Sequence, residues 1–171
     1  KGDTMINYDK TELNKIDENI FKLIGSDWML VTAGSIDKFN TMTASWGAFG
    51  VLWNKPVSFI FVRPTRYTYE FLQKNVNFSL TFFDEKYRKA LNICGTKSGR
   101  DTDKVREAGL TPRASKSGLV YFEEAKLVIE CTKLYFHDIT PENILLPSIN
   151  NLYNNDYHRM YIGEITGIMK K

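Results

Sequence analysis

Cysteine and histidine are scarce in this sequence, and their scarcity limits the chemistry available to it. The 171 residues include two cysteines, Cys94 and Cys131, and two histidines, His137 and His158. Two cysteines do not form a disulfide framework, and we expect both to be reduced thiols in a cytoplasmic protein. A site with three histidine ligands cannot be built, and the carboxylates near the histidines lack metal-ligand spacing. The sequence therefore predicts no metal site.

Long apolar runs and blocks of one charge are missing as well. No run approaches the ~18 to 20 apolar residues of a membrane span, and residues 1–26 lack the apolar core of a signal peptide. The 23 basic and 20 acidic residues are mostly interleaved, so we expect no continuous basic face for nucleic acid. We predict an intracellular protein that binds neither membrane nor nucleic acid. The net charge of +3 still permits a small anionic ligand.

Apolar residues are plentiful, at 43% hydrophobic and 13% aromatic, which is enough for the core of a single domain over residues 1–171. Apolar or alternating runs predict strands, and apolar residues at helical spacing predict short helices between them. The predicted strands cover residues 28–36, 56–64, 76–84, 125–139 and 157–169. The predicted helices cover residues 11–25, with Thr11 as cap, and 65–75, 85–95 and 101–109. So many strands favour a mainly β fold, a closed or partly closed barrel with inserted helices.

One extended stretch, "NTMTASWGAFGVLWNKP" (residues 40–56), has an unusual composition for a strand. It carries small hydroxyl residues, glycines and alanines beside two tryptophans, and a polar turn at residues 37–40 joins it to the preceding strand. Strand interiors usually prefer branched or aromatic side chains. Small residues in a strand suggest that another group approaches the backbone closely.

Two segments have the composition of anion sites. "RPTRYT" places Arg63 at the end of a strand, and Arg66 with Thr68 at the beginning of a helix, which together could bind a phosphate. Two arginines in a loop could equally be solvated surface. "CGTKSGRDTDK" has the glycines and hydroxyls of an anion-binding nest but lacks the spacing of a P-loop. The chain also lacks the Gly-x-Gly-x-x-Gly of a Rossmann dinucleotide site.

Nucleophilic catalysis has one formal candidate pair, Cys94 and His158. Cys94 lies at the end of a predicted helix in "ALNIC", where a buried thiol is more common than a nucleophile. His158, between Tyr157 and Arg159, is the better functional candidate of the two histidines. A single histidine is nevertheless more often a structural hydrogen-bonding residue than a proton donor.

The order of five segments along the chain resembles the flavin reductase-like family of FMN-binding split barrels, and within it the flavoredoxin-type branch. These segments are "NTMTASWG", "RPTRYTYEFL", "NICGTKSGRDTDK", "YFEEAKLVIEC" and "HRMYIGEI". The resemblance extends from about Trp28 to Met169, and residues 1–20 lie outside it. It implies a split barrel that binds FMN.

The resemblance also implies which residues would bind FMN. Small side chains at Thr43, Ala44, Ser45 and Gly47 would let the flat ring lie against the backbone. The strand and turn that line the isoalloxazine would comprise Asn40, Thr41, Met42, Thr43, Ala44, Ser45 and Trp46. The phosphate and ribityl chain would be bound by Arg63, Arg66 and Thr68, with Tyr67 packing nearby. The segment that closes over the ring would contribute Cys94, Ser98, Gly99, Asp101 and Lys104.

Family members are typically homodimers in which the last strand can reach the partner's flavin, and His158 is our candidate for that catalytic role. Two-component reductases that use NADH commonly have Gly-Asp-His before this strand, whereas this chain has Asp156-Tyr157-His158. We therefore expect an FMN-dependent oxidoreductase, with NADH or NADPH as donor and a free flavin, metal complex or protein as acceptor. The altered motif leaves open an electron carrier whose FMN is reduced by a separate enzyme.

Overall fold

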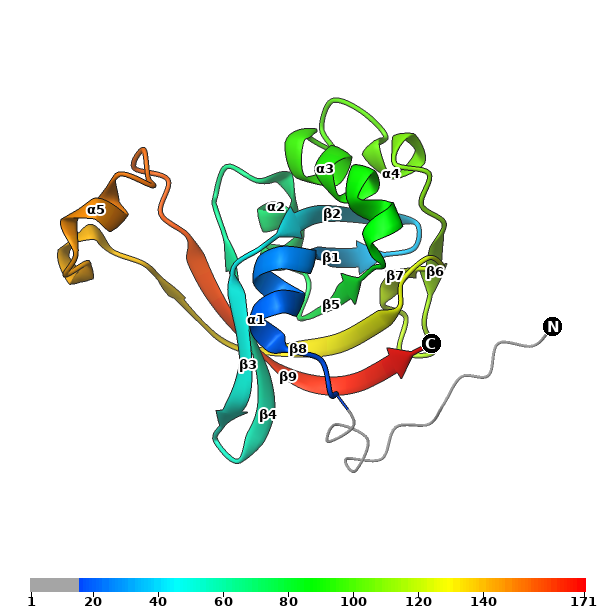
Figure 1. The fold of residues 1–171 in the computed structure, drawn as a ribbon, viewed down its shortest axis with the longest axis horizontal. Helices are drawn as coiled ribbons and strands as arrows, with labels where there is room; N and C mark the ends of the chain where they lie inside the picture. Colours follow the sequence, from blue (N-terminus) through cyan, green and yellow to red (C-terminus); the bar gives the residue numbers. More distant parts are fainter. Residues whose placement is uncertain (1–15) are drawn as a thin grey trace.

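The computed structural model describes residues 16–171, in which strands predominate and the helices are short (Figure 1). The strands are β1 (Met29–Ser35), β2 (Lys38–Ala44), β3 (Gly47–Leu52), β4 (Lys55–Val62), β5 (Asn77–Phe82), β6 (Pro112–Ala114), β7 (Val120–Phe122), β8 (Leu127–Asp138) and β9 (Arg159–Lys170). The α-helices are α1 (Ile20–Lys22), α2 (Tyr67–Lys74), α3 (Arg88–Thr96), α4 (Lys104–Glu107) and α5 (Pro147–Asn150). A π-helical turn, η2 (Leu23–Asp27), and two 3-10 turns, η3 (Glu85–Tyr87) and η4 (Pro141–Asn143), complete the described elements. No helix within residues 16–171 has the length and apolar character needed to cross a membrane.

Seven of the described strands form one antiparallel sheet that curls into a barrel. The strand order is β2-β1-β5-β8-β9-β4-β3, so β2 and β3 are the two edges of the sheet. Only Ser45 and Trp46 separate these edge strands along the chain. Because two residues cannot span an open sheet, its edges must curl toward each other. The result is a mainly β barrel, as the sequence predicts, and its seam lies between β2 and β3.

The barrel wall is shaped by irregular pairing between its two longest strands. The β8–β9 register shifts between Glu130 and Cys131 and again between Lys133 and Tyr135. Such bulges bend a strand and increase its twist. A glycine lies in the same region, because a Cβ atom at Gly163 would be 2.6 Å from Cζ of Phe78. These features let β9 cross from β8 to β4 within a curved wall.

The hydrophobic residues divide into two clusters, one on each side of the sheet. Phe78, Leu80 and Phe82 of β5 belong to the cluster inside the barrel. A second cluster includes Leu30 and Val128 from the other face of the sheet, covered by α3 and by β7. Since β1 has both faces covered, its residues from Met29 to Ala33 are all buried. This explains why it appears in the sequence as a continuous apolar run.

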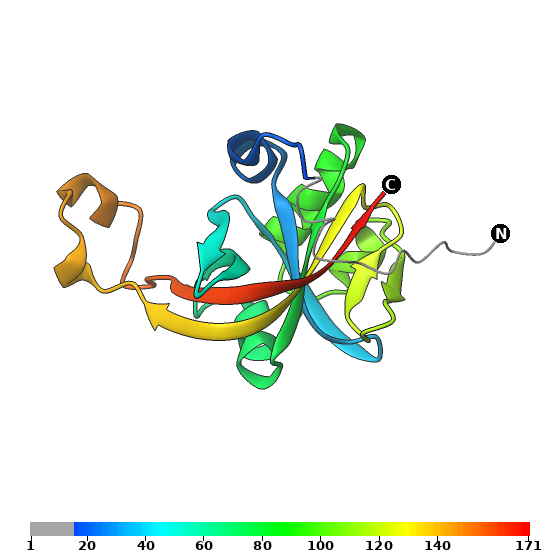
Figure 2. The ribbon, with the colours of Figure 1, turned by 90° about the horizontal axis from the view of Figure 1, so that it is seen from below.

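The end of β8 and the chain that leads from it to β9 extend beyond the barrel as an arm (residues 134–158), whose tip carries η4 and α5. Figures 1 and 2 show the arm projecting from one side of the barrel in both views. Residues 152–158 lead from the tip back to β9, and we call them the return segment. Large apolar side chains are exposed on the tip: Leu145, Leu146, Ile149 and Leu152.

The structure corrects several predicted boundaries. The helix predicted for residues 11–25 has its N-cap at Asn19, whose side chain accepts a hydrogen bond from the Lys22 N–H. Ile16 therefore lies before this helix. The predicted cap, Thr11, is outside the described residues. The extended stretch 40–56 is divided between β2 and β3, which continues through a tight turn at Trp53 and Asn54 into β4. The short ribbon of β6 and β7 was not predicted, because three-residue strands are too short to show periodicity.

Candidate functional site

A cavity of about 190 Å³ opens beside the seam of the barrel, and we call it the seam cavity. The end of β2 and the link to β3 form one wall, the end of β4 and the loop before α2 form another, and the residue preceding β9 completes it. The lining residues are Met42, Thr43, Ala44, Ser45, Trp46, Phe61, Arg63, Arg66 and His158. The fold thus brings together three sequence segments that are far apart in the chain.

Small side chains and a sheet edge give this cavity access to main-chain atoms. Among the described residues β2 pairs with β1 alone, so the other side of its backbone has no strand partner. Backbone N–H and C=O groups on such an edge can hydrogen-bond a ligand, as they would an added strand. The small Ala44 and Ser45 leave this edge open to a flat ligand.

Two of the small or hydroxyl residues also have packing roles. A Cβ atom at Gly47 would lie 2.8 Å from the carbonyl oxygen of Phe59 in β4. This close contact is by itself a sufficient reason for glycine at position 47. Gly47 does not line the seam cavity. The hydroxyl of Thr43 donates to the carbonyl of Leu91 at 2.5 Å and fastens α3 to β2. Packing within the barrel therefore explains Gly47 and Thr43, and the approach of a ligand would explain the other small residues of this stretch.

The two arginines of the seam cavity are held differently. Arg66 is half-buried, and its Nη1 donates to the carbonyl oxygen of Gly95 at 2.8 Å. Burial lowers the pKa of Arg66, and the nearby Arg63 lowers it further. Arg63 instead donates to Asp156 Oδ2 at 2.5 Å and to the Leu152 carbonyl at 2.9 Å. Two guanidinium groups lining one small cavity make it favourable for an anion.

His158 is buried in the opposite wall and is bound to aromatic neighbours. Its ring centroid is 4.9 Å from that of Trp46, and its Nδ1 lies 3.1 Å from the Tyr153 hydroxyl. Burial, and secondarily the charge of Arg63, lowers the pKa of His158 to about 4. The imidazole is therefore neutral near pH 7, where it can hydrogen-bond a ligand without adding charge.

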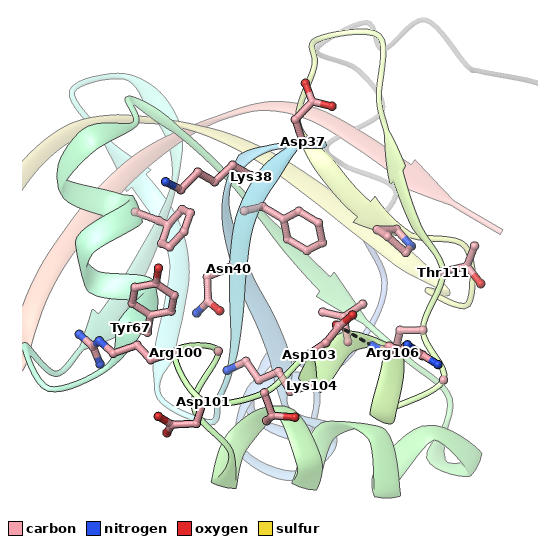
Figure 3. A pocket seen from close by; sticks show the side chains of 18 residues that line it. Asp37, Lys38, Asn40, Tyr67, Arg100, Asp101, Asp103, Lys104, Arg106 and Thr111 are labelled. Carbon is pink, nitrogen blue, oxygen red and sulfur yellow. Dashed lines mark hydrogen bonds between the residues drawn. The ribbon is translucent and has the colours of Figure 1, made fainter.

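A second, larger cavity of about 870 Å³ lies beside the first, and we call it the loop cavity (Figure 3). It is bounded by β2, α2 and the segment from Gly99 to Pro112. The two cavities are neighbours, because Asn40 and Tyr67 line the loop cavity while Met42 and Arg66 line the seam cavity. The charged residues around the loop cavity are of both signs: Lys38, Arg100, Lys104 and Arg106, with Asp37, Asp101 and Asp103.

Lys104 holds the loop between the two cavities in place. Its side chain is buried, and Nζ donates to the carbonyls of Cys94 at 3.2 Å and Lys97 at 3.1 Å. Burial lowers the pKa of Lys104 to about 8. At the other end of the loop, a Cβ atom at Gly99 would collide with Oδ1 of Asn40, so the loop lies directly against β2.

The predicted site residues fall into three groups. Eight line the seam cavity: Met42, Thr43, Ala44, Ser45, Trp46, Arg63, Arg66 and His158. Five line the loop cavity: Asn40, Tyr67, Gly99, Asp101 and Lys104. Four line neither: Thr41, Thr68, Cys94 and Ser98. The predicted residues thus surround one region, whose wall is supplied partly by the strand β2 and partly by the segment from Gly99 to Pro112.

The four remaining residues have internal contacts. The hydroxyls of Thr41 and Thr32 lie 2.8 Å apart, and Thr68 accepts a hydrogen bond from Asn40 Nδ2 at 2.7 Å. Ser98 accepts from the Arg100 N–H at 3.2 Å. The thiol of Cys94 is fully buried, and burial raises its pKa to about 11. A protonated thiol that does not line the cavity of His158 is not an activated nucleophile.

Phe61 lines the seam cavity and was not predicted, and two further unpredicted residues bind side chains that line it. Tyr153 bonds His158, and Asp156 bonds Arg63, and both belong to the return segment of the arm. Asp156 stands in the altered Asp156-Tyr157-His158 motif, but its contact with Arg63, like that of Tyr153 with His158, depends on how the arm folds back. The only sequence signal is that Asp156 stands two residues before His158.

Comparison with known proteins supports a flavin-related fold. The family model described as flavin reductase like domain matches residues 21–170. A flavoredoxin from Methanosarcina acetivorans has 22% identity and a TM-score of 0.67, with 85% of this chain and 68% of that chain covered. An FMN-binding protein from Thermus thermophilus has 20% identity and a TM-score of 0.66, covering 84% and 71%. An NADH:FAD oxidoreductase from Streptomyces globisporus has 16% identity and a TM-score of 0.64, covering 85% and 75%. No curated protein sequence matches significantly.

Proposed function

Because the chain belongs to the flavin reductase-like domain family, we propose that it is an oxidoreductase that binds FMN at the seam cavity. The observation that carries the proposal is the combination at one place of an open strand edge, two arginines and a buried neutral histidine. A flavin has a flat ring with hydrogen-bonding edges and, in FMN, a terminal phosphate. The cavity offers a matching group for each part.

The residues can be assigned to the parts of FMN. The isoalloxazine would lie against the backbone from Thr43 to Trp46, where edge N–H groups can donate to the ring. Arg63 and Arg66 would bind the phosphate through charge-assisted hydrogen bonds. The bound flavin would supply hydride or electron transfer, and the chain would position the ring, exclude water and shift the potential.

Size supports a ligand that extends from one cavity to the other. Pockets for ligands of this class typically measure roughly 300 to 1,000 Å³, more than the 190 Å³ of the seam cavity. FMN would therefore reach under the loop that Lys104 fastens and into the loop cavity. This accounts for the division of the predicted residues between two neighbouring cavities.

The electron donor separates two forms of the proposal. In the first, the protein is a reductase that takes hydride from NADH or NADPH and passes electrons to a free flavin, a metal complex or a protein. In the second, it is an electron carrier reduced by another enzyme. The second is favoured by one observation: Asp156, in the altered Asp-Tyr-His motif, is bound to Arg63 beside His158. The resemblance to both a flavoredoxin and an NADH:FAD oxidoreductase is compatible with either.

An anaerobic absorption spectrum tests both forms. The protein is saturated with FMN, and the flavin absorbance is followed after NADH and then NADPH is added. Rapid bleaching would identify a reductase. A flavin that binds but stays oxidised until a separate reductase is supplied would identify a carrier. If FMN does not bind at all, the proposed function is wrong.

We also propose that the protein is a homodimer. The support is the arm, whose tip exposes Leu145 at 94%, Leu146 at 58% and Leu152 at 53%. Exposed apolar residues gathered on one projecting element are typical of an interaction surface. In a dimer, such an arm could pack against the partner subunit near its seam cavity.

A further inference from the structure

Arg63 is bound almost entirely by the return segment of the arm. Its Nη1 donates to Asp156 Oδ2 at 2.5 Å, its Nη2 donates to the carbonyl of Leu152 at 2.9 Å, and its guanidinium carbon lies 5.2 Å from the centroid of the Tyr153 ring. The side chains of Arg63 and Asp156 are 29% and 20% exposed, so water screens this ion pair only partly. Arg63 therefore joins the wall of the seam cavity formed by the end of β4 to the return segment of the arm.

The return segment is also the structure that holds His158. The Tyr153 hydroxyl lies 3.1 Å from His158 Nδ1, and the Tyr153 and Trp46 rings are 6.5 Å apart. Asp156 is fixed as well, because its Oδ1 accepts the N–H of Asn154 at 2.9 Å. That hydrogen bond and the bond from Arg63 lower the pKa of Asp156, so the carboxylate is ionised near pH 7.

A carboxylate and a phosphate compete for the same guanidinium. Both present two oxygens to the fork of an arginine, and two anions on one cation repel each other. The guanidinium of Arg66, by contrast, has no carboxylate within salt-bridge distance among residues 16–171, and its one hydrogen bond to these residues is to the carbonyl oxygen of Gly95. Arg66 is therefore available to an incoming phosphate, whereas Arg63 is already neutralised by Asp156.

We propose that Asp156 occupies the anion subsite at Arg63 and thereby sets how strongly the seam cavity prefers phosphorylated over unphosphorylated flavin. The inference rests on the proposed function. A phosphorylated flavin must displace the Asp156 carboxylate to reach both arginines, and the return segment moves with it. A flavin without phosphate leaves the ion pair undisturbed.

The test compares Asp156→Asn with a matched control, Asp138→Asn. Asp138 pairs with Arg159 at 2.6 Å on the same arm, outside the lining of either cavity. FMN and riboflavin are titrated into each protein, and the dissociation constants are measured by flavin fluorescence at low salt. In Asp156→Asn we expect FMN to bind roughly three- to tenfold more tightly, the range of an ion pair that is partly screened. Riboflavin binding should stay unchanged, and Asp138→Asn should bind both flavins as the parent does.

Several results would overturn the inference. FMN binding that is unchanged or weaker in Asp156→Asn would mean that Asp156 orients Arg63 for the phosphate instead of competing with it. Equal tightening of FMN and riboflavin would mean that the return segment obstructs the ring and that charge is not involved. If Asp156→Asn does not fold, judged by its thermal unfolding, Asp156→Ser serves in its place. A parent protein that binds neither flavin would refute the proposed function itself, whereas a parent that binds FMN with no effect of Asp156 would refute this inference alone.

Discussion

At the residue scale, the seam cavity combines charged groups that the fold holds in unequal ways. Arg66 is half-buried and bonded to a backbone carbonyl, whereas Arg63 is bonded to a carboxylate. His158 lies near both of them but stays neutral because it is buried. Each of these differences has a measurable consequence.

Replacing Arg66 with alanine should weaken FMN binding on the order of 1.5 to 3 kcal/mol, because a charge-assisted phosphate contact is lost. The measurement is an FMN titration of Arg66→Ala beside Arg88→Ala. Arg88 is a suitable control because it binds the Ser26 carbonyl and the Trp28 ring, outside both cavities. If Arg66→Ala binds FMN as tightly as the parent, the phosphate assignment is wrong.

His158 should make the folded protein sensitive to acid. Its pKa is about 4 when folded, whereas histidine in an unfolded chain titrates near about 6.5. Between these values the unfolded chain binds a proton that the folded chain does not, so the free energy of unfolding falls as the pH is lowered from 6.5 to 4 and this contribution levels off below that. Urea unfolding at several pH values should give a shallower decline for His158→Phe than for the parent.

The control for this experiment is His137→Phe, since His137 is exposed on the arm and lines neither cavity. This variant keeps His158 and should therefore keep the decline in stability that His158 causes between pH 6.5 and 4. The comparison uses the slope and not the absolute stability, because His158→Phe also loses the hydrogen bond with Tyr153. An unchanged slope in His158→Phe would show that this histidine has the same pKa in the folded and the unfolded chain.

At the scale of elements, the curvature of β9 depends on a residue without a side chain. A Cβ atom at Gly163 would lie 2.6 Å from the Phe78 ring and 3.1 Å from Cβ of Cys131, inside the barrel core. Gly163→Ala should therefore destabilise the fold by about 1 to 3 kcal/mol, the usual cost of overpacking. Urea unfolding measures this against Gly50→Ala in β3, where a Cβ atom would meet nothing within 4 Å. Equal stability of the two variants would mean that Phe78 moves aside without cost.

The elements differ in how well the sequence predicts them. Apolar runs identify β1 and β4, and the alternation of Phe78 with polar residues identifies β5 as a half-buried strand; the structure buries Ser79 and Thr81 of β5 as well. The sequence does not reveal the break between β2 and β3, because only Ser45 and Trp46 separate these two extended segments. Motifs identified the strand edge, the two arginines and His158 as candidates. Asp156 and Tyr153 could not be identified, because their place depends on tertiary folding of the arm.

At the scale of the whole molecule, the barrel buries most of its large apolar side chains, whereas the tip of the arm leaves its own exposed. The arm exposes four large apolar residues at its tip, and none of them is buried by residues 16–171 of the same copy. Leu145→Asp combined with Leu146→Asp should therefore shift a dimer to monomer, because charged side chains would have to be buried in the interface. Sedimentation velocity of the parent and the variant measures the change.

Phe21→Asp is the control for the arm variant. Phe21 is 89% exposed but lies on α1, on the barrel and away from the tip of the arm (Figure 1). We expect this variant to sediment as the parent does. A parent protein that is monomeric at micromolar concentration would contradict the proposed dimer. A dimer that survives the arm substitutions would place the interface elsewhere.

The seam has a consequence for the order in which the chain acquires its structure. The hairpins β1–β2 and β3–β4 join residues close in sequence, but the barrel wall is completed by β4 pairing with β9, and Lys55 and Glu164 of these strands are 109 residues apart. Contacts between such distant residues form slowly, because a long loop must be closed first. During synthesis on a ribosome, the strand edge and Arg66 emerge well before His158. The seam cavity can therefore assemble only in the last stage of folding, after the arm has folded back.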